Sequence, residues 1–159
     1  MHVLTTGYEA GGHTRVVERW IENAPTSQIH SVIQTKTTKV KLDVLADDVK
    51  EKKGEFISLE NNLSLKEKAI KLRKLAMEYE FVILHTHMED PIATIAFGTE
   101  DFTRPVLFYN HASHHPWLGK SIADLVLDIE NNDPVTIENR EITNTYFLGV
   151  PSKKISISI

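Results

Sequence analysis

The chain contains no cysteine, and this absence removes several kinds of site at once. A protein without thiols has no disulfide framework, no thiolate ligand for zinc and no cysteine nucleophile. Long apolar runs are also missing, since none approaches the ~20 residues that a membrane-spanning helix needs. The N-terminus does not begin with a basic segment followed by an apolar one, which is how a secretory signal would look. These absences predict a cytoplasmic protein, with peripheral attachment at the inner face of the membrane left open.

A large excess of charge is missing too. The 18 basic and 22 acidic residues give a formal net charge of −4, so the chain has no general attraction to nucleic acid or to an anionic membrane. Hydrophobic residues make up 41% and charged residues 25%, both close to the averages of globular proteins. With 159 residues, the chain has the length of one ordinary domain with one core.

Short apolar segments alternate with amphipathic ones along the chain. The apolar segments predict strands at residues 3–6, 29–34, 55–59, 81–85, 105–109 and 125–129. The amphipathic segments predict helices, one of which begins with a capping box formed by Ser64 and Glu67. This alternation predicts an α/β fold, in which a doubly wound, mostly parallel Rossmann-like sheet has helices on both faces. Ligands of such sheets bind outside the carboxyl ends of the strands.

The pattern weakens after residue 129. Residues 131–134 mark a turn, and residues 135–142 fit a helix and a loose strand equally well. Residues 154–159 alternate apolar side chains with serine, as a strand or a linker does. We therefore expect a Rossmann-like domain over residues 1–150, and over residues 151–159 the start of a linker or strand that leads to a second domain.

A pair of glycines precedes the first predicted helix and opens a candidate phosphate-binding loop. The residues of this loop are Gly11, Gly12, His13, Thr14 and Arg15. The start of a helix offers unpaired amide groups and a partial positive charge, both of which favour a phosphate. The glycine spacing matches neither the Walker loop nor the dinucleotide fingerprint. A tight structural turn therefore stays open as the alternative interpretation.

Five of the eight histidines lie between residues 85 and 115, near the ends of two predicted strands. A structural role in the interior suits His85, which lies inside its strand. His87 and Glu89 lie at the exit of the same strand and are candidates for a site. Asp90 is a candidate as well, although it also suits a helix cap, with Pro91 at the first helical position.

The segment after the fifth predicted strand combines polar and aromatic side chains. Its candidate site residues are Asn110, His111, His114, His115 and Trp117. Histidine donates, accepts or binds metal near neutral pH, and tryptophan offers a flat face for a sugar or a base. A metal-dependent hydrolase or metal-binding domain is one alternative, although the sequence lacks a clear third or fourth ligand at strand spacing. No GxSxG nucleophile motif is present to support acyl hydrolysis.

Three stretches carry a resemblance to a known family. GGHTRVVERWI after a first strand, followed by FVILHTHMEDPIATIAF and VLFYNHASHHPWLGKSIADLVLDI, resembles the N-terminal domain of retaining glycosyltransferases of group 1, or family 4. The likeness covers most of the chain and is firmest at residues 3–22 and 81–129. It implies one half of a GT-B fold, which receives the acceptor while a second Rossmann-like domain binds the nucleotide-sugar. Since this chain does not supply that second domain, the isolated domain is expected to be inactive.

The resemblance also implies roles for the candidate residues. Gly11, Gly12, His13, Thr14 and Arg15 would lie on the side of the donor diphosphate, and His111 would contact the sugar near the reacting carbon as the catalytic residue. The acceptor side would consist of His87, Glu89, Asp90, Asn110, His114, His115 and Trp117. The nucleotide-sugar would be a co-substrate and no metal or other cofactor is implied. The implied partners are a carbohydrate, lipid or protein acceptor and the missing C-terminal domain. The remaining alternative is a non-catalytic Rossmann-like binding module.

Overall fold

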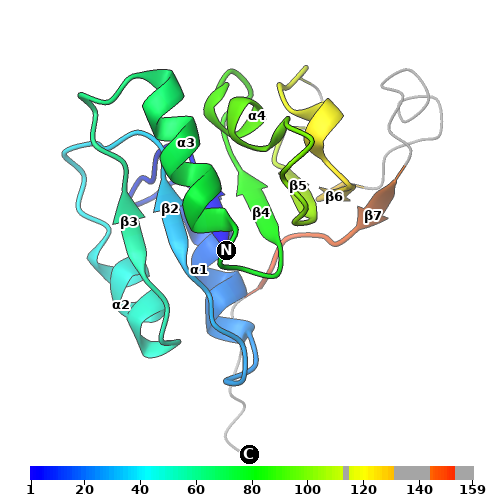
Figure 1. Ribbon diagram of the computed structural model, residues 1–159. Coiled ribbons are helices and arrows are strands. Elements are labelled where there is room, and N and C mark those ends of the chain that lie inside the picture. The colour runs from blue at the N-terminus through cyan, green and yellow to red at the C-terminus, as the bar shows by residue number, and fades with distance from the viewer. Residues whose placement is uncertain (113–114, 131–143, 153–159) are drawn as a thin grey trace, which may run out of the picture.

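A seven-stranded parallel sheet forms the centre of the computed structural model, which describes residues 1–112, 115–130 and 144–152. The strand order is β3-β2-β1-β4-β5-β6-β7, and each described pair of neighbours is parallel (Figure 1). The strands are β1 (His2–Leu4), β2 (Val32–Gln34), β3 (Phe56–Ser58), β4 (Val82–His85), β5 (Val106–Asn110), β6 (Leu125–Asp128) and β7 (Thr145–Phe147). The predicted α/β class with a Rossmann-like sheet is confirmed.

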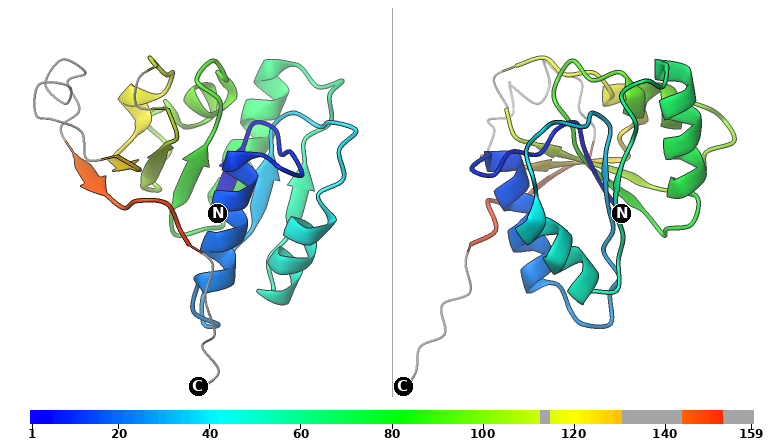
Figure 2. Two further views of the ribbon diagram at one scale, coloured as in Figure 1. Left: turned by 180° about the vertical axis from the view of Figure 1, so that it is seen from behind. Right: turned by 90° about the vertical axis from the view of Figure 1, so that its left-hand side faces the viewer.

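Helices cover both faces of the sheet (Figure 2). Helices α1 (Gly12–Asn23) and α2 (Asp43–Glu51) lie on one face, and α3 (Leu65–Ala76) and α4 (Ile92–Phe97) lie on the other. Each helix turns an apolar stripe inward: Ile21 of α1 and Leu45 of α2 share one buried cluster, whereas Leu72 of α3 and Ala96 of α4 share another. A short 3-10 helix, η1 (Lys120–Ile122), precedes β6. The chain is thus doubly wound, as the alternation of segments predicted.

Two helix starts were predicted from local sequence. The capping box of α3 is present, because Ser64 Oγ accepts from the Glu67 amide and the Glu67 carboxylate accepts from the Ser64 amide. At α4, Asp90 Oδ1 accepts from the Ile92 amide at 2.9 Å, which confirms its capping role. Pro91 precedes the first helical residue instead of occupying it. This offset of one residue is within the usual uncertainty of helix boundaries. Proline has no amide N–H to satisfy, and the next amide, that of Ile92, donates to Asp90.

The sheet ends at β7, which the sequence pattern did not predict. Residues 148–152 then run back along α1, where the Asn23 side-chain amide donates to the Ser152 carbonyl at 3.3 Å. The Tyr109 hydroxyl of β5 donates to the Gly149 carbonyl at 2.6 Å. Residues 135–142 and 154–159, for which the sequence suggested a helix, strand or linker, lie outside the described residues.

Within the described part of the chain, no helix combines the length and the apolar character that crossing a membrane requires.

Candidate functional site

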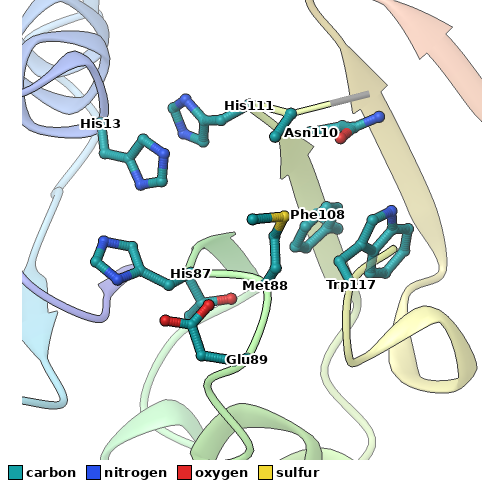
Figure 3. A pocket seen from close by; sticks show the side chains of 10 residues that line it. His13, His87, Met88, Glu89, Phe108, Asn110, His111 and Trp117 are labelled. Atoms are coloured by element: carbon teal, nitrogen blue, oxygen red, sulfur yellow. The ribbon is translucent and has the colours of Figure 1, made fainter. Parts of the chain in front are cut away.

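The candidate site lies where the winding of the sheet reverses. Strands β1 and β4 are neighbours, but the chain leaves β1 for α1 on one face and leaves β4 for α4 on the other. Such a reversal opens a crevice at the carboxyl ends of the strands. A cavity of about 260 Å³ occupies this place (Figure 3). Its lining residues are His13, Thr86, His87, Met88, Glu89, Phe108, Asn110, His111, Ala112 and Trp117.

Three histidines from three different segments meet in this cavity. His13 comes from the first turn of α1, His87 follows β4, and His111 follows β5. The rings of His13 and His111 stack with their centroids 3.8 Å apart, and His87 meets His13 edge-on at 5.4 Å. The sequence predicts these residues at one edge of the sheet, and the folded chain brings them into ring contact.

Burial keeps the imidazoles of His13 and His111 neutral. It lowers the pKa of His111 to about 3, with smaller contributions from the neighbouring charges of His13 and His87. Burial also lowers the pKa of His13, although a hydrogen bond to the backbone of His85 acts in the opposite direction. At neutral pH, His13 and His111 are therefore uncharged groups that can form hydrogen bonds and ring contacts in the cavity.

The ring geometry bears on the metal alternative. A metal ion bound by an imidazole lies in the plane of that ring, and the planes of His13 and His111 are nearly parallel, 22° apart, in a stack. Two rings stacked in this way do not direct their lone pairs at one ion. Among the residues that the structure describes, no group of three or more histidine or acidic side chains is arranged to hold a metal ion. The two residues of the His-x-His pair also separate, since His85 is fully buried and His87 lines the cavity.

An aromatic pair forms another wall of the cavity. The Trp117 ring stacks on Phe108 with centroids 3.9 Å apart and planes 11° apart, so one indole face is packed and the ring is held in position. Asn110 is anchored through its side-chain amide, which donates to Asp128 Oδ1 at 2.7 Å. Glu89 adds a carboxylate at the same cavity. The wall thus offers apolar ring surface beside hydrogen-bonding groups, which is the combination that sugars bind.

The glycine loop contributes less to the cavity than its sequence suggested. Of residues 11–15, His13 alone lines the cavity. Thr14 is buried, and its hydroxyl oxygen accepts a hydrogen bond from the Tyr8 amide at 2.9 Å. The half-exposed Arg15 forms an ion pair with Glu18 at 2.9 Å. Gly11 is the N-cap residue of α1 and has no side chain that could accept a hydrogen bond from the first amides of the helix. These amides therefore receive no capping hydrogen bond from the N-cap residue.

Asp90 has a structural role. Its Oδ2 accepts from the Thr5 hydroxyl at 2.7 Å and from the Thr35 hydroxyl at 2.6 Å. The residue thereby ties the ends of β1 and β2 to the start of α4, and it is buried. It does not line the 260 Å³ cavity but borders a neighbouring hollow of about 580 Å³, which shares His87 and Glu89 with that cavity.

One candidate residue from the sequence lies away from the cavity, and another is not described. His115 is exposed and is not among the residues that line the cavity. His114 lies outside the described residues. The acceptor side as predicted is therefore represented in the cavity by His87, Glu89, Asn110 and Trp117.

Two histidines that the sequence pattern does not single out are connected to the site. His2 and His30 are buried at the other end of the strands, and a series of ring-to-ring hydrogen bonds links them to His85 and His111. The signal that could have found them is the parallel pairing of β1 with β2 and β4, which places His2 between the two partners. That pairing is a property of the fold and cannot be obtained from the spacing of the histidines alone.

Comparison of the chain with protein-family models, with curated proteins and with solved structures finds no match. The function is therefore argued from the fold, the cavity and the residues that line it.

Proposed function

We propose that this chain is the acceptor-side, N-terminal domain of a retaining GT-B glycosyltransferase. In this proposal, a second Rossmann-like domain binds a nucleotide-sugar and closes over the carboxyl edge of the sheet. The sugar is then transferred to a carbohydrate, lipid or protein acceptor held by this domain. Without the second domain, the chain binds its acceptor but does not transfer sugar.

The observation that carries the proposal is the convergence of three loops at the reversal of the sheet. The segments after β1, β4 and β5 supply His13, His87 and His111 to one cavity. These are the segments in which the sequence resembles the glycosyltransferase family. A cavity of about 260 Å³ is at the small end for a ligand site and has room for about one sugar ring.

The chemistry of the lining supports a neutral, hydroxyl-rich ligand. Neutral His111 and His13 donate or accept hydrogen bonds without demanding a charged partner, and Trp117 and Phe108 supply apolar ring surface. Glu89 is the acidic group of the lining, and its carboxylate can accept a hydrogen bond from a hydroxyl of the ligand. Under the proposal, His111 lies beside the transferred sugar, while His87, Glu89 and Trp117 hold the acceptor.

Calorimetric titration tests the proposal with the chain as it is. The probes are a panel of methyl glycosides, sugar phosphates and nucleotide-sugars, each titrated into protein purified without a histidine tag. At least one sugar of the panel is expected to bind, and His87→Ala to weaken that binding about tenfold through the loss of one hydrogen bond to the ligand. Lys74→Ala, on the exposed end of α3, is the matched control and is expected to leave binding unchanged.

Two outcomes would count against the proposal. One is the absence of binding across the panel. The other is stoichiometric zinc binding that is lost in both His87→Ala and His111→Ala, which would favour a metal-binding domain instead.

A further inference from the structure

A row of hydrogen-bonded imidazoles crosses the protein beneath α1. Starting at the cavity, His111 Nε2 lies 3.3 Å from His85 Nδ1, and His85 Nε2 lies 3.1 Å from His2 Nδ1. His2 Nε2 then lies 2.9 Å from His30 Nδ1, and His30 Nε2 lies 3.2 Å from Gln28 Oε1. Each of the three links joins an Nδ1 of one ring to an Nε2 of the next, so the four rings face the same way along the row.

The far end of the row reaches a second opening. His30 and Gln28 border a hollow of about 360 Å³, together with Met1 and Phe81 from the amino ends of β1 and β4. Gln28 is exposed, whereas His2 and His85 are fully buried between the two ends. The row therefore connects the candidate site at the carboxyl edge of the sheet with the surface at the opposite edge.

Hydrogen-bond chemistry fixes the direction of the row. A neutral imidazole has one N–H and one bare nitrogen, so each ring that donates on one side must accept on the other. Gln28 presents its oxygen, so His30 Nε2 donates to it and His30 Nδ1 accepts from His2. Because His2 donates from Nε2, its Nδ1 accepts from His85 Nε2. His85 Nδ1 in turn accepts from His111 Nε2. The Nδ1 of His111 is left bare.

Charge is disfavoured along the middle of the row. Burial lowers the pKa of His85 and of His2 well below the usual value, with further lowering by the N-terminal ammonium and by neighbouring imidazoles of the row. His13, which stacks on His111, also lowers the pKa of His85. The other neighbours of the row, Trp20 and Tyr109, pack against His85 as uncharged rings.

The two ends of the row differ in what surrounds them. At the cavity, burial opposes an imidazolium at His111, and the neighbouring imidazoles of His13 and His87 lower its pKa further. At the far end, burial lowers the pKa of His30, and the N-terminal amino group and Lys52 lower it further, but the oxygen of Gln28 accepts from its Nε2 and the surface is adjacent. Burial lowers the pKa of the N-terminal amino group itself to about 6, so this group opposes a charge at His30 less at higher pH. A positive charge therefore has a hydrogen-bond acceptor and nearby water at His30, which it lacks at His85 and His2.

We propose that His111, His85, His2 and His30 form a proton relay, which lets His111 act as a base in the cavity while the charge it takes up comes to rest at His30. The inference rests on the proposed role of the cavity as a ligand site, because it assigns His111 a function towards a hydroxyl bound there. His85 and His2 are positioning residues in this scheme, since they act through His111.

The relay moves one proton equivalent by four linked transfers. A hydroxyl in the cavity loses its proton to His111 Nδ1 and keeps the electron pair on oxygen. His111 passes its Nε2 proton to His85 Nδ1, and His85 passes its Nε2 proton to His2 Nδ1. His2 then passes its Nε2 proton to His30 Nδ1. His30 ends as an imidazolium that still donates to Gln28, and the other three rings end neutral with the opposite nitrogen protonated.

Long-range ¹H–¹⁵N correlation spectra of the full chain, recorded from pH 8 downwards, test the relay without any ligand. At pH 8, His111 is expected to carry its proton on Nε2. On acidification, His30 is expected to become an imidazolium while His111 changes to the Nδ1–H tautomer and stays neutral. Because the rings titrate as one unit, both changes are expected to share one midpoint.

Exposed Gln28 provides variants that leave the core intact. Gln28→Glu places a carboxylate beside His30 and is expected to raise the shared midpoint by up to about one pH unit. Gln28→Met removes the acceptor at similar length and is expected to lower it. An imidazolium signal at His111, or a His111 tautomer that does not change when His30 becomes charged, would overturn the relay. Neither result would bear on whether the cavity binds sugar, since no ligand is present.

Discussion

The histidines of this chain take their roles from burial and partners. His85 and His87 are two residues apart, yet one is sealed beneath α1 in a row of imidazoles and the other faces the cavity. His13 and His111 are 98 positions apart and stack at 3.8 Å. At the scale of single residues, the structure thus divides the histidines into a group that lines the cavity and an internal hydrogen-bonded group, and His111 belongs to both.

Burial of the histidines makes stability depend on pH. The pKa of His111 falls from 6.5 to about 3 on folding, so between these values the unfolded chain binds a proton that the folded chain does not. The contribution of His111 to the free energy of unfolding is therefore fully present above pH 6.5, and it is lost progressively as the pH drops below that value. For His111 this loss is expected to be about 2 kcal/mol between pH 7 and pH 5, measured by urea denaturation at both values.

His2 and His85 shift in the same direction, so their contributions add to that of His111. The variant His111→Gln isolates one of these contributions. It is expected to reduce the difference in unfolding free energy between pH 7 and pH 5 by about 2 kcal/mol. An unchanged difference would show that His111 is protonated equally in the folded and unfolded chain.

Single elements of the fold position the site through their ends. The start of α1 delivers His13, and the loop between β4 and α4 delivers His87 and Glu89. Both starts were indicated by local sequence, since glycine precedes α1 and an aspartate precedes α4. The contacts that hold these ends were not, because Asp90 binds Thr5 and Thr35 from distant strands. Local sequence gives the boundary of an element, whereas the long-range contact depends on strand order.

The carboxylate of Asp90 is expected to be a principal stabilising group at the carboxyl edge of the sheet. Asp90→Ala removes the acceptor of two hydroxyls and of the Ile92 amide, and leaves that amide buried without its partner. We expect a loss of about 3 kcal/mol in the free energy of unfolding. Asp90→Asn keeps one oxygen and is expected to lose less. A loss below about 1 kcal/mol for the alanine variant in urea denaturation would contradict this account.

The two glycines before His13 are expected to respond oppositely to alanine. A Cβ at Gly12 would meet nothing within 4 Å, so Gly12→Ala should raise the free energy of unfolding by about 0.4–1 kcal/mol through the lower entropy of the unfolded chain. A Cβ at Gly11 would lie 2.9 Å from Tyr8 Cβ, so Gly11→Ala should destabilise the fold. Thermal unfolding of both variants measures this, and destabilisation by Gly12→Ala would contradict the open space at the helix start.

The whole molecule was predictable in its layers and only partly in its site. Six of the seven strands follow from apolar segments of the sequence, because buried parallel strands are apolar on both faces. The cavity at the sheet edge follows from where His13, His87 and His111 occur relative to those strands. The row through His2 and His30 does not follow, because it depends on which strands are neighbours. Phe108 and Met88 were also missed, since an apolar residue in a strand gives no sign that it borders a cavity.

If the cavity at the ends of β4 and β5 and the start of α1 binds a sugar, mapping of backbone amide shifts tests this most directly. The full chain labelled with ¹⁵N would be titrated with the sugar that binds best in the calorimetric panel. The account predicts saturable shifts confined to the cavity segments, at residues 12–14, 86–89, 108–112 and 117. Shifts centred on another face of the sheet, or none at ligand concentrations that saturate the calorimetric signal, would contradict it.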